Sequence, residues 1–181
     1  DNLVDRTVAH WGRIDVLVCN AGINPVYGPL TALGDEAYEK IMRVNVQSPL
    51  WLAARVMPLM AEGGGGSVIL MASIGGLRGS AVIGAYGMSK AALVSLARNL
   101  AVEWGPKGIR VNAIAPGVVR TDFAKALTED PVRLARMRER TPLRRFGEPE
   151  EIAGIAHFLA SPASSYMTGQ VLVADGGETV T

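Results

Sequence analysis

Ser73, Tyr86 and Lys90 are the residues whose types and spacing most directly suggest chemistry. Tyr86 and Lys90 are four residues apart, so on a helix they share one face, with Cβ atoms about 5–6 Å apart. A free phenol has a pKa of about 10, which a nearby ammonium can lower by roughly 1–3 units. Tyr86 could then exchange a proton with a substrate hydroxyl or carbonyl, and Ser73 could hydrogen-bond the same oxygen. Alone, the Tyr–Lys spacing is equally typical of an ordinary helix surface.

Four short apolar runs predict the strands that must position these side chains. A nearly continuous apolar run is typical of a strand buried on both faces, and such runs occupy residues 14–19, 67–71, 109–114 and 170–174. Ser73 follows the second of them. The carboxyl ends of parallel strands are where open α/β sheets bind ligands, so this placement favours a functional role for the Ser73 hydroxyl.

Helical patterns alternate with the strands. An amphipathic pattern begins the chain, and others cover residues 36–60, with a break expected near Ser48 and Pro49, residues 85–104 and residues 148–159. Tyr86 and Lys90 would then open the third of these helices. The alternation predicts parallel strands joined by right-handed crossovers in an α/β sandwich, and without an internal repeat or linker residues 1–181 form a single domain.

Composition narrows the class of function. The 181 residues contain 18 Lys and Arg against 17 Asp and Glu, and this net charge of +1 gives no general attraction to nucleic acid or an anionic membrane. No apolar run reaches the roughly 18 residues of a membrane span. Cys19 is the lone cysteine, no metal-ligand spacing occurs, and the first residues do not resemble a signal peptide. We therefore expect a cytoplasmic protein that acts on a small molecule, without a metal site.

Further motifs surround the Tyr–Lys pair in a specific order. Cys19-Asn20-Ala21-Gly22 ends the first predicted strand, Asn45 lies within a helix, and Asn112-Ala113-Ile114-Ala115-Pro116-Gly117 ends the third strand, with Thr121 just beyond. Together with Ser73, Tyr86 and Lys90, they resemble the short-chain dehydrogenase/reductase family. These are single-domain oxidoreductases that have a Rossmann-like, doubly wound parallel sheet and use nicotinamide cofactors. The resemblance runs from about residue 14 to residue 177.

The resemblance implies four catalytic residues. Tyr86 would be the acid/base, and Ser73 would orient the reacting carbonyl or alcohol. Lys90 would hold the nicotinamide ribose and depress the pKa of Tyr86. Asn45 would hold a water that relays protons from Lys90 to solvent.

The same resemblance implies a cofactor, NAD or NADP, with the choice between them not readable. The residues expected to contact it are Asn20, Ala21, Gly22, Tyr86, Lys90, Pro116, Gly117, Val119 and Thr121. Cys19 departs from the asparagine that the family usually has at this position, a mild change because a small Cys packs well when buried.

A larger departure is the absence of the Gly-x-x-x-Gly-x-Gly loop that holds the pyrophosphate in the family. Because the chain opens at Asp1 within a helical pattern, we expect the first βαβ units to be missing from it. The implied function is hydride transfer between NAD(H) or NADP(H) and a secondary alcohol/ketone pair. The alternative is a non-catalytic remnant, or a truncated chain, that cannot hold the dinucleotide. The resemblance also implies a homodimer or homotetramer, assembled through helices 36–60 and 85–104.

Overall fold

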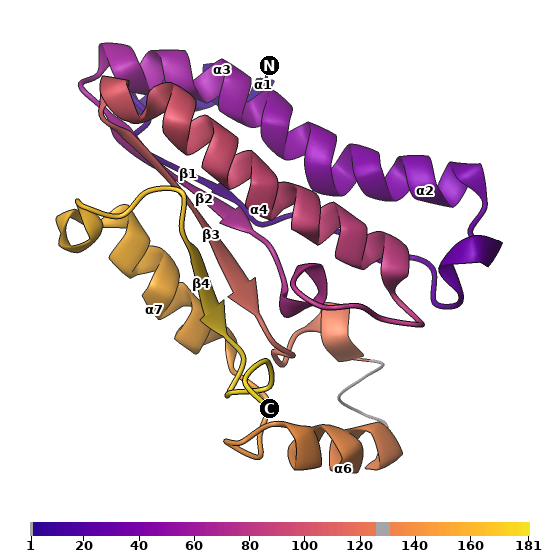
Figure 1. Cartoon of the computed structure of the whole chain (residues 1–181). Coiled ribbons are helices and arrows are strands. Elements are labelled where there is room, and N and C mark those ends of the chain that lie inside the picture. Colours follow the sequence, from indigo (N-terminus) through magenta and orange to yellow (C-terminus); the bar gives the residue numbers. More distant parts are fainter. Residues whose placement is uncertain (1, 126–130) are drawn as a thin grey trace.

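The computed structural model describes residues 2–125 and 131–181, without the side chains of residues 132, 133 and 137. Its centre is a parallel sheet in the order β1-β2-β3-β4 (Figure 1). The strands are β1 (Val16–Cys19), β2 (Gly66–Met71), β3 (Ile109–Pro116) and β4 (Val171–Ala174). The predicted strands and the α/β class are confirmed, and β1 lies at one edge of this sheet.

Helices cover the two faces of the sheet unequally. One face carries α1 (Asn2–Trp11), α3 (Ser48–Glu62) and the long α4 (Gly84–Trp104), whereas α7 (Pro149–Ala160) covers part of the other (Figure 1). The alternating side chains of the strands divide accordingly: Val68 and Leu70 face α3 and α4, and Ile69 faces α7. The predicted helices 85–104 and 148–159 are thus confirmed.

The predicted helix 36–60 continues through its expected break. It comprises α2 (Asp35–Met42), a π-helical turn η2 (Arg43–Gln47) and α3, and Pro49 stands in the first turn of α3, where its missing N–H is harmless. The irregularity therefore precedes Ser48 and contains Asn45. Insertions of this kind in α-helices occur frequently at functional sites.

Shorter elements complete the chain. They are η1 (Leu30–Ala32), η3 (Ile74–Gly76), η4 (Gly105–Lys107), η5 (Asp122–Ala124), α6 (Pro131–Arg140) and η6 (Pro162–Ser164). Among the helices in the described residues, none is long and apolar enough to cross a membrane.

The carboxyl ends of the strands meet at one edge of the sheet, beside the start of α4 (Figure 1). Register pairs Cys19 with Leu70 and Met71 with Ile114, so the segments that follow β1, β2 and β3 leave the sheet side by side. These segments carry the predicted site residues. The fold thereby brings sequence-distant motifs to one edge.

Candidate active site

Lys90 is a buried ammonium at the centre of the site. Only 3% of the residue is exposed, and burial lowers the pKa of Lys90 to about 8. Its Nζ donates a hydrogen bond of 2.7 Å to the main-chain oxygen of Met71, at the end of β2. An ammonium has three N–H donors, so further donors can serve a ligand hydroxyl.

Tyr86 and Ser73 lie together beside Lys90. The Nζ atom of Lys90 is 5.5 Å from the centroid of the Tyr86 ring, which confirms that the pair shares one helix face. Burial raises the pKa of Tyr86 above its usual value, while a hydrogen bond with Ser73 opposes that rise. The Ser73 hydroxyl also accepts the Gly75 N–H at 3.1 Å.

The expected lowering of the pKa of Tyr86 by Lys90 is wrong for the protein without ligands. Burial from water disfavours the phenolate and is the larger effect here. The phenol is therefore protonated at neutral pH, which is the form that can donate a proton to a carbonyl oxygen.

Asn45 is fully buried and connects the segment after β1 with α4. Its Nδ2 donates to the main-chain oxygen of Ile23 and to Ser89 Oγ, both at 2.9 Å, and its Oδ1 accepts the Ile23 N–H at 2.8 Å. Ser89 Oγ in turn donates to the main-chain oxygen of Tyr86 at 2.7 Å. Both amide N–H groups of Asn45 are thus used, so a relayed water would need the remaining lone pair of Oδ1.

Gly22 permits close approach to this group. A Cβ at Gly22 would lie 3.1 Å from Lys90 Nζ and 3.5 Å from Asn45 Oδ1, so a side chain there would crowd both. The structure therefore brings together Gly22, Asn45, Ser73, Tyr86 and Lys90. Asn20 and Ala21 are exposed at the same edge, immediately after β1.

The second group of predicted cofactor residues follows β3. A Cβ at Gly117 would lie 2.8 Å from Asp175 Cα, so this position needs glycine where the chain passes the end of β4. Val119 forms a bridge with Gly147, and the Thr121 hydroxyl donates to the main-chain oxygen of Val119 at 3.4 Å. Pro116, Gly117, Val119 and Thr121 thus lie at the carboxyl edge, on the β4 side.

Three participants were not predicted. Ser89 couples Asn45 to Tyr86, and its place in the Tyr-Gly-Met-Ser-Lys motif was the available signal. Gly76 allows η3 to touch α4, because a Cβ there would lie 2.6 Å from the main-chain carbon of Lys90, and the Gly75-Gly76 pair was its signal. Met71 acts through its main-chain oxygen, which every residue possesses, so its type gave no signal.

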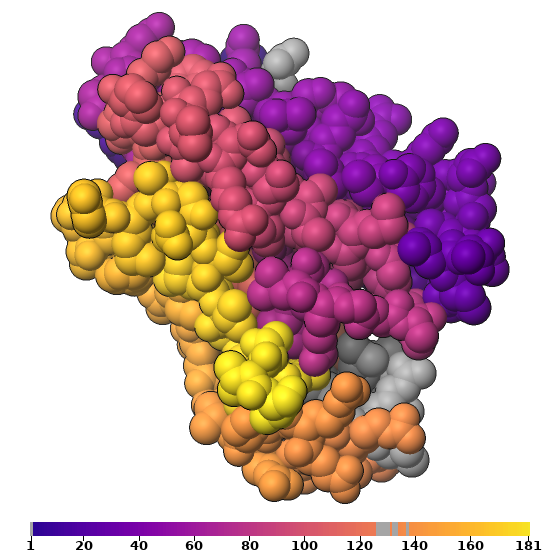
Figure 2. All heavy atoms as spheres, in the orientation of Figure 1, coloured from indigo at the N-terminus to yellow at the C-terminus, as the bar shows by residue number. Residues whose placement is uncertain are grey.

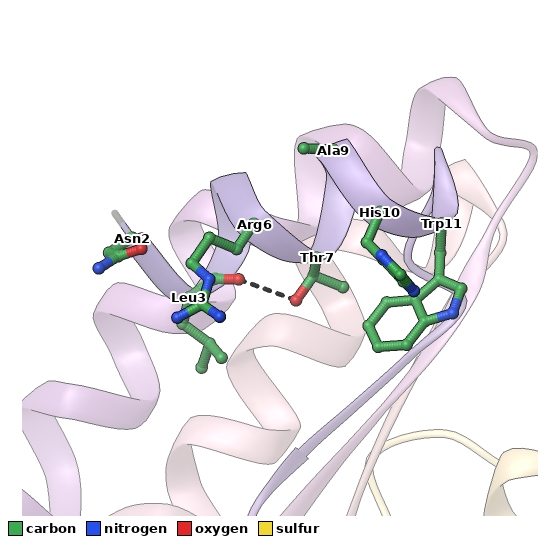
Figure 3. Close-up of a pocket in the computed structure, with 7 residues that line it drawn as sticks. All are labelled: Asn2, Leu3, Arg6, Thr7, Ala9, His10 and Trp11. Atoms are coloured by element: carbon green, nitrogen blue, oxygen red, sulfur yellow. Dashed lines mark hydrogen bonds between the residues drawn. The ribbon is translucent and has the colours of Figure 1, made fainter.

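Other parts of the described chain offer weaker candidates for a functional site. No cluster of three His, Cys, Asp or Glu side chains that could hold a metal occurs in it. A hollow of about 890 Å³ lies along α1 (Figure 3). Its lining includes Leu3, Thr7 and Trp11 and comes from α1 alone, so it is an open helix flank that contains none of the predicted site residues.

Comparison with known proteins gives consistent matches over nearly the whole chain. A family model described as enoyl-(acyl carrier protein) reductase matches residues 1–179. The chain is 41% identical over 177 residues to dehydrogenase/reductase SDR family member 4 of Sus scrofa, which covers 98% of this chain and 63% of that protein. The chain thus spans somewhat under two thirds of that relative.

Solved structures match equally well. A gluconate 5-dehydrogenase from Burkholderia cenocepacia J2315, in complex with NADP and tartrate, superimposes with a TM-score of 0.94 and 35% identity, covering 98% of this chain and 69% of that one. A 4-hydroxyisoleucine dehydrogenase complexed with NADH gives a TM-score of 0.93 and 30% identity, covering 99% of this chain and 74% of that one.

Proposed function

Because this chain belongs to the short-chain dehydrogenase/reductase family, we propose that it supplies the nicotinamide and substrate side of an NAD(P)-dependent oxidoreductase. The reaction is reversible hydride transfer between NAD(H) or NADP(H) and a secondary alcohol/ketone pair. The observation that carries the proposal is the placement of the buried Lys90 ammonium, 5.5 Å from the Tyr86 ring centroid. Burying a charge with a single acceptor costs stability, so a structural role does not account for it.

The residues present fit the nicotinamide half of the cofactor. The absence of a side chain at Gly22 leaves the spare donors of Lys90 approachable, and these suit a ribose hydroxyl. Pro116, Gly117, Val119 and Thr121 would hold the carboxamide. When bound, the nicotinamide supplies or accepts the hydride.

Proton transfer falls to the chain's own residues. In the reductive direction, the Tyr86 phenol donates its proton to the carbonyl oxygen of the substrate, while the Ser73 hydroxyl hydrogen-bonds that oxygen. Lys90 stabilises the resulting phenolate with its positive charge. Asn45 holds the segment after β1 against α4 and supports the proposed water relay with its remaining lone pair.

Substitution of Tyr86 tests this assignment in the purified protein. Tyr86→Phe should lower kcat at least about 100-fold, because the proton donor is lost, and leave cofactor affinity largely intact. Lys90→Ala should weaken both turnover and cofactor binding. Unchanged turnover in Tyr86→Phe would refute the mechanism.

A second candidate is that the 181-residue polypeptide is itself non-catalytic. Its sequence holds no glycine loop for the pyrophosphate, and β1 is an edge strand of the sheet in the described residues, with Val16 and Val18 exposed. On this second candidate, the polypeptide would bind NAD(H) and NADP(H) weakly at best. Calorimetric titration of the polypeptide with both dinucleotides tests this candidate. One-to-one binding at micromolar concentration would exclude it.

We further propose a homodimer or homotetramer in the cytoplasm. Trp51 on α3 and Met88 and Val102 on α4 are exposed apolar side chains that self-association would cover. The buried, unpaired Cys19 suits a reducing compartment. A monomer mass by light scattering at high micromolar concentration would contradict the first expectation, and localisation of the tagged protein in cells tests the second.

A further inference from the structure

An ion pair joins the turn that follows β4 to the segment between the predicted catalytic residues Ser73 and Tyr86. Arg78 Nη2 donates a hydrogen bond of 2.5 Å to Glu178 Oε1, across 100 residues of sequence. The Glu178 side chain is only 6% exposed, whereas that of Arg78 is 39% exposed. Because a carboxylate removed from water needs a charged donor, the pair fixes where these two segments lie relative to each other.

Arg78 comes directly after the short helix η3 that starts from Ser73. The Ser73 hydroxyl accepts the Gly75 N–H at 3.1 Å, and the main-chain oxygen of Ser73 accepts the Gly76 N–H at 2.9 Å. Residues 73–77 therefore form one hydrogen-bonded turn. A contact that holds Arg78 consequently also holds the backbone that carries the Ser73 hydroxyl.

The segment that continues from this turn towards α4 has few other anchors. Residues 77–82 are all exposed, so little packing fixes their path. The Gly28 N–H donates to the main-chain oxygen of Val82 at 2.8 Å, which holds the part next to α4. The ion pair of Arg78 holds the part next to Ser73.

The turn that carries Glu178, residues 175–181, is itself well held. The Asp175 carboxylate accepts two main-chain N–H groups of the turn, at 2.8 and 2.7 Å. A Cβ at Gly176 would lie 2.7 Å from Thr141 Cγ2, so the turn lies directly against the chain that follows α6. Figure 2 shows this turn, in yellow, between the magenta segment that follows β2 and the orange region of α6. Glu178 thus has a well-defined position from which to hold Arg78.

Stability alone does not account for this pair. The second carboxylate oxygen of Glu178, Oε2, is buried and has no hydrogen-bond partner among the described residues. A buried polar atom without a partner destabilises a fold, and two apolar side chains at these positions would avoid that cost. What an ion pair supplies, and apolar side chains do not, is a directed contact at one defined distance.

We propose that Arg78 and Glu178 are positioning residues, whose ion pair holds the backbone after Ser73 so that the Ser73 hydroxyl stays aligned with the Tyr86 phenol. The two groups are close enough for this, since a Cβ at Gly75 would lie 3.4 Å from Ser73 Oγ and 3.6 Å from Tyr86 Cε1. The inference rests on the proposed function for the chemistry of Ser73 and Tyr86. The positioning itself does not depend on turnover.

Hydrogen exchange of the purified protein tests the positioning without a substrate. Arg78→Met keeps an apolar stem and removes the charged donor. In this variant, the amide of Gly75, which donates to Ser73 Oγ, should exchange at least about tenfold faster than in the wild type. The amide of the fully buried Leu70, in β2, should change much less. Equal acceleration of both amides would show general destabilisation and overturn the proposal.

Removing both charges separates positioning from stability. The double variant Arg78→Met/Glu178→Met contains no unpaired buried carboxylate, so its urea midpoint should equal or exceed that of the wild type. Gly75 should still exchange faster. Arg13→Met is the matched control, because it removes the ion pair with Asp15 before β1, at the opposite edge of the sheet, and should leave Gly75 unchanged. Wild-type exchange of Gly75 in the double variant would overturn the proposal.

A double-mutant cycle connects the positioning to the reaction. With butanone as the probe ketone, Arg78→Met/Glu178→Met should lower kcat about tenfold and leave cofactor affinity unchanged. In the Ser73→Ala background the same change should have little further effect, because the hydroxyl to be aligned is gone. Arg78→Lys keeps a charged donor for Glu178 and should retain most of the wild-type kcat.

The outcomes of the two experiments distinguish this inference from the proposed function. An equal loss of kcat with and without the Ser73 hydroxyl would mean a merely structural role and would overturn the proposal. If Gly75 exchange responds as expected but the wild type shows no turnover, the proposed function fails and the positioning stands.

Discussion

The two faces of the sheet differ in how completely they are covered. The face beneath α1, α3 and α4 contains a continuous core that includes Met57, Val68 and Leu93, each 1% exposed or less. On the α7 face, Ile69, Ile114 and Leu159 form a small cluster. Val18, which pairs with Ile69 in register, is 45% exposed on that same face.

This difference in coverage determines how firmly each part of the site is packed. Lys90 and Tyr86, the predicted catalytic lysine and tyrosine, stand on α4, so they are held by the fully covered face. The open part of the α7 face lies beneath β1, whose end carries Asn20 and Ala21. Packing is therefore strongest at the predicted proton-transfer residues and weakest beside one set of predicted cofactor contacts.

We expect the largest change in the free energy of unfolding when Ile69→Ala is compared with Val18→Ala. Ile69 is fully buried beneath α7, so its truncation should lower the free energy of unfolding by about 3 kcal/mol. Val18→Ala should cost less than about 1 kcal/mol, since its side chain is nearly half exposed. Urea denaturation measures both. Equal losses would mean that β1 is covered in solution and that the two parts of this face are alike.

We expect a smaller effect on stability from the buried charge of Lys90, on the fully covered face. The pKa of Lys90 is about 8 in the folded state, below its usual value, so the unfolded chain binds more protons above pH 8. The contribution of Lys90 to stability should therefore rise with pH, by about 2 kcal/mol between pH 7 and pH 10.

Lys90→Met isolates this contribution from other titrating groups, such as Cys19, whose pKa is raised to about 11. As pH rises from 7 to 10, the free energy of unfolding of the wild type should increase relative to that of Lys90→Met. A pH-independent difference would show that the ammonium is solvated rather than buried.

The smallest expected effect lies in the connection that leads into α7. Arg144 has φ of 56°, in the left-handed region that L-residues other than glycine seldom adopt. Arg144→Gly should raise the free energy of unfolding by up to about 1 kcal/mol. Arg138→Gly, at an exposed position of α6, should instead lower it by about 1 kcal/mol. Thermal melting of both variants checks the opposite signs, and destabilisation by Arg144→Gly would contradict the backbone argument.

The sequence predicted most of the fold because its signals are local. Continuous apolar runs marked the strands, and the four-residue spacing placed Tyr86 and Lys90 on one helix face, as the structure shows. The predicted pKa direction of Tyr86 was wrong because burial depends on segments far away in the chain. Likewise, the acceptor for Lys90 is a main-chain oxygen of Met71, which no residue type reveals.

The roles of the individual site residues stay predictions. The structure brings Gly22, Asn45, Ser73, Tyr86 and Lys90 together, but their chemistry depends on partners that bind at this edge.

The π-helical turn at Arg43–Gln47 sets the phase of the helix that follows it. Ile41, Asn45, Pro49 and Ala53 are all buried, in successive steps of four residues. On an uninterrupted α-helix, each such step would rotate a side chain about 40° further round the axis, and the series would leave the core. The wider turn absorbs part of this drift. Chain length there is consequently under a stricter constraint than residue type, because a one-residue deletion would rotate all of α3 relative to α2, whereas most substitutions on its exposed side would not.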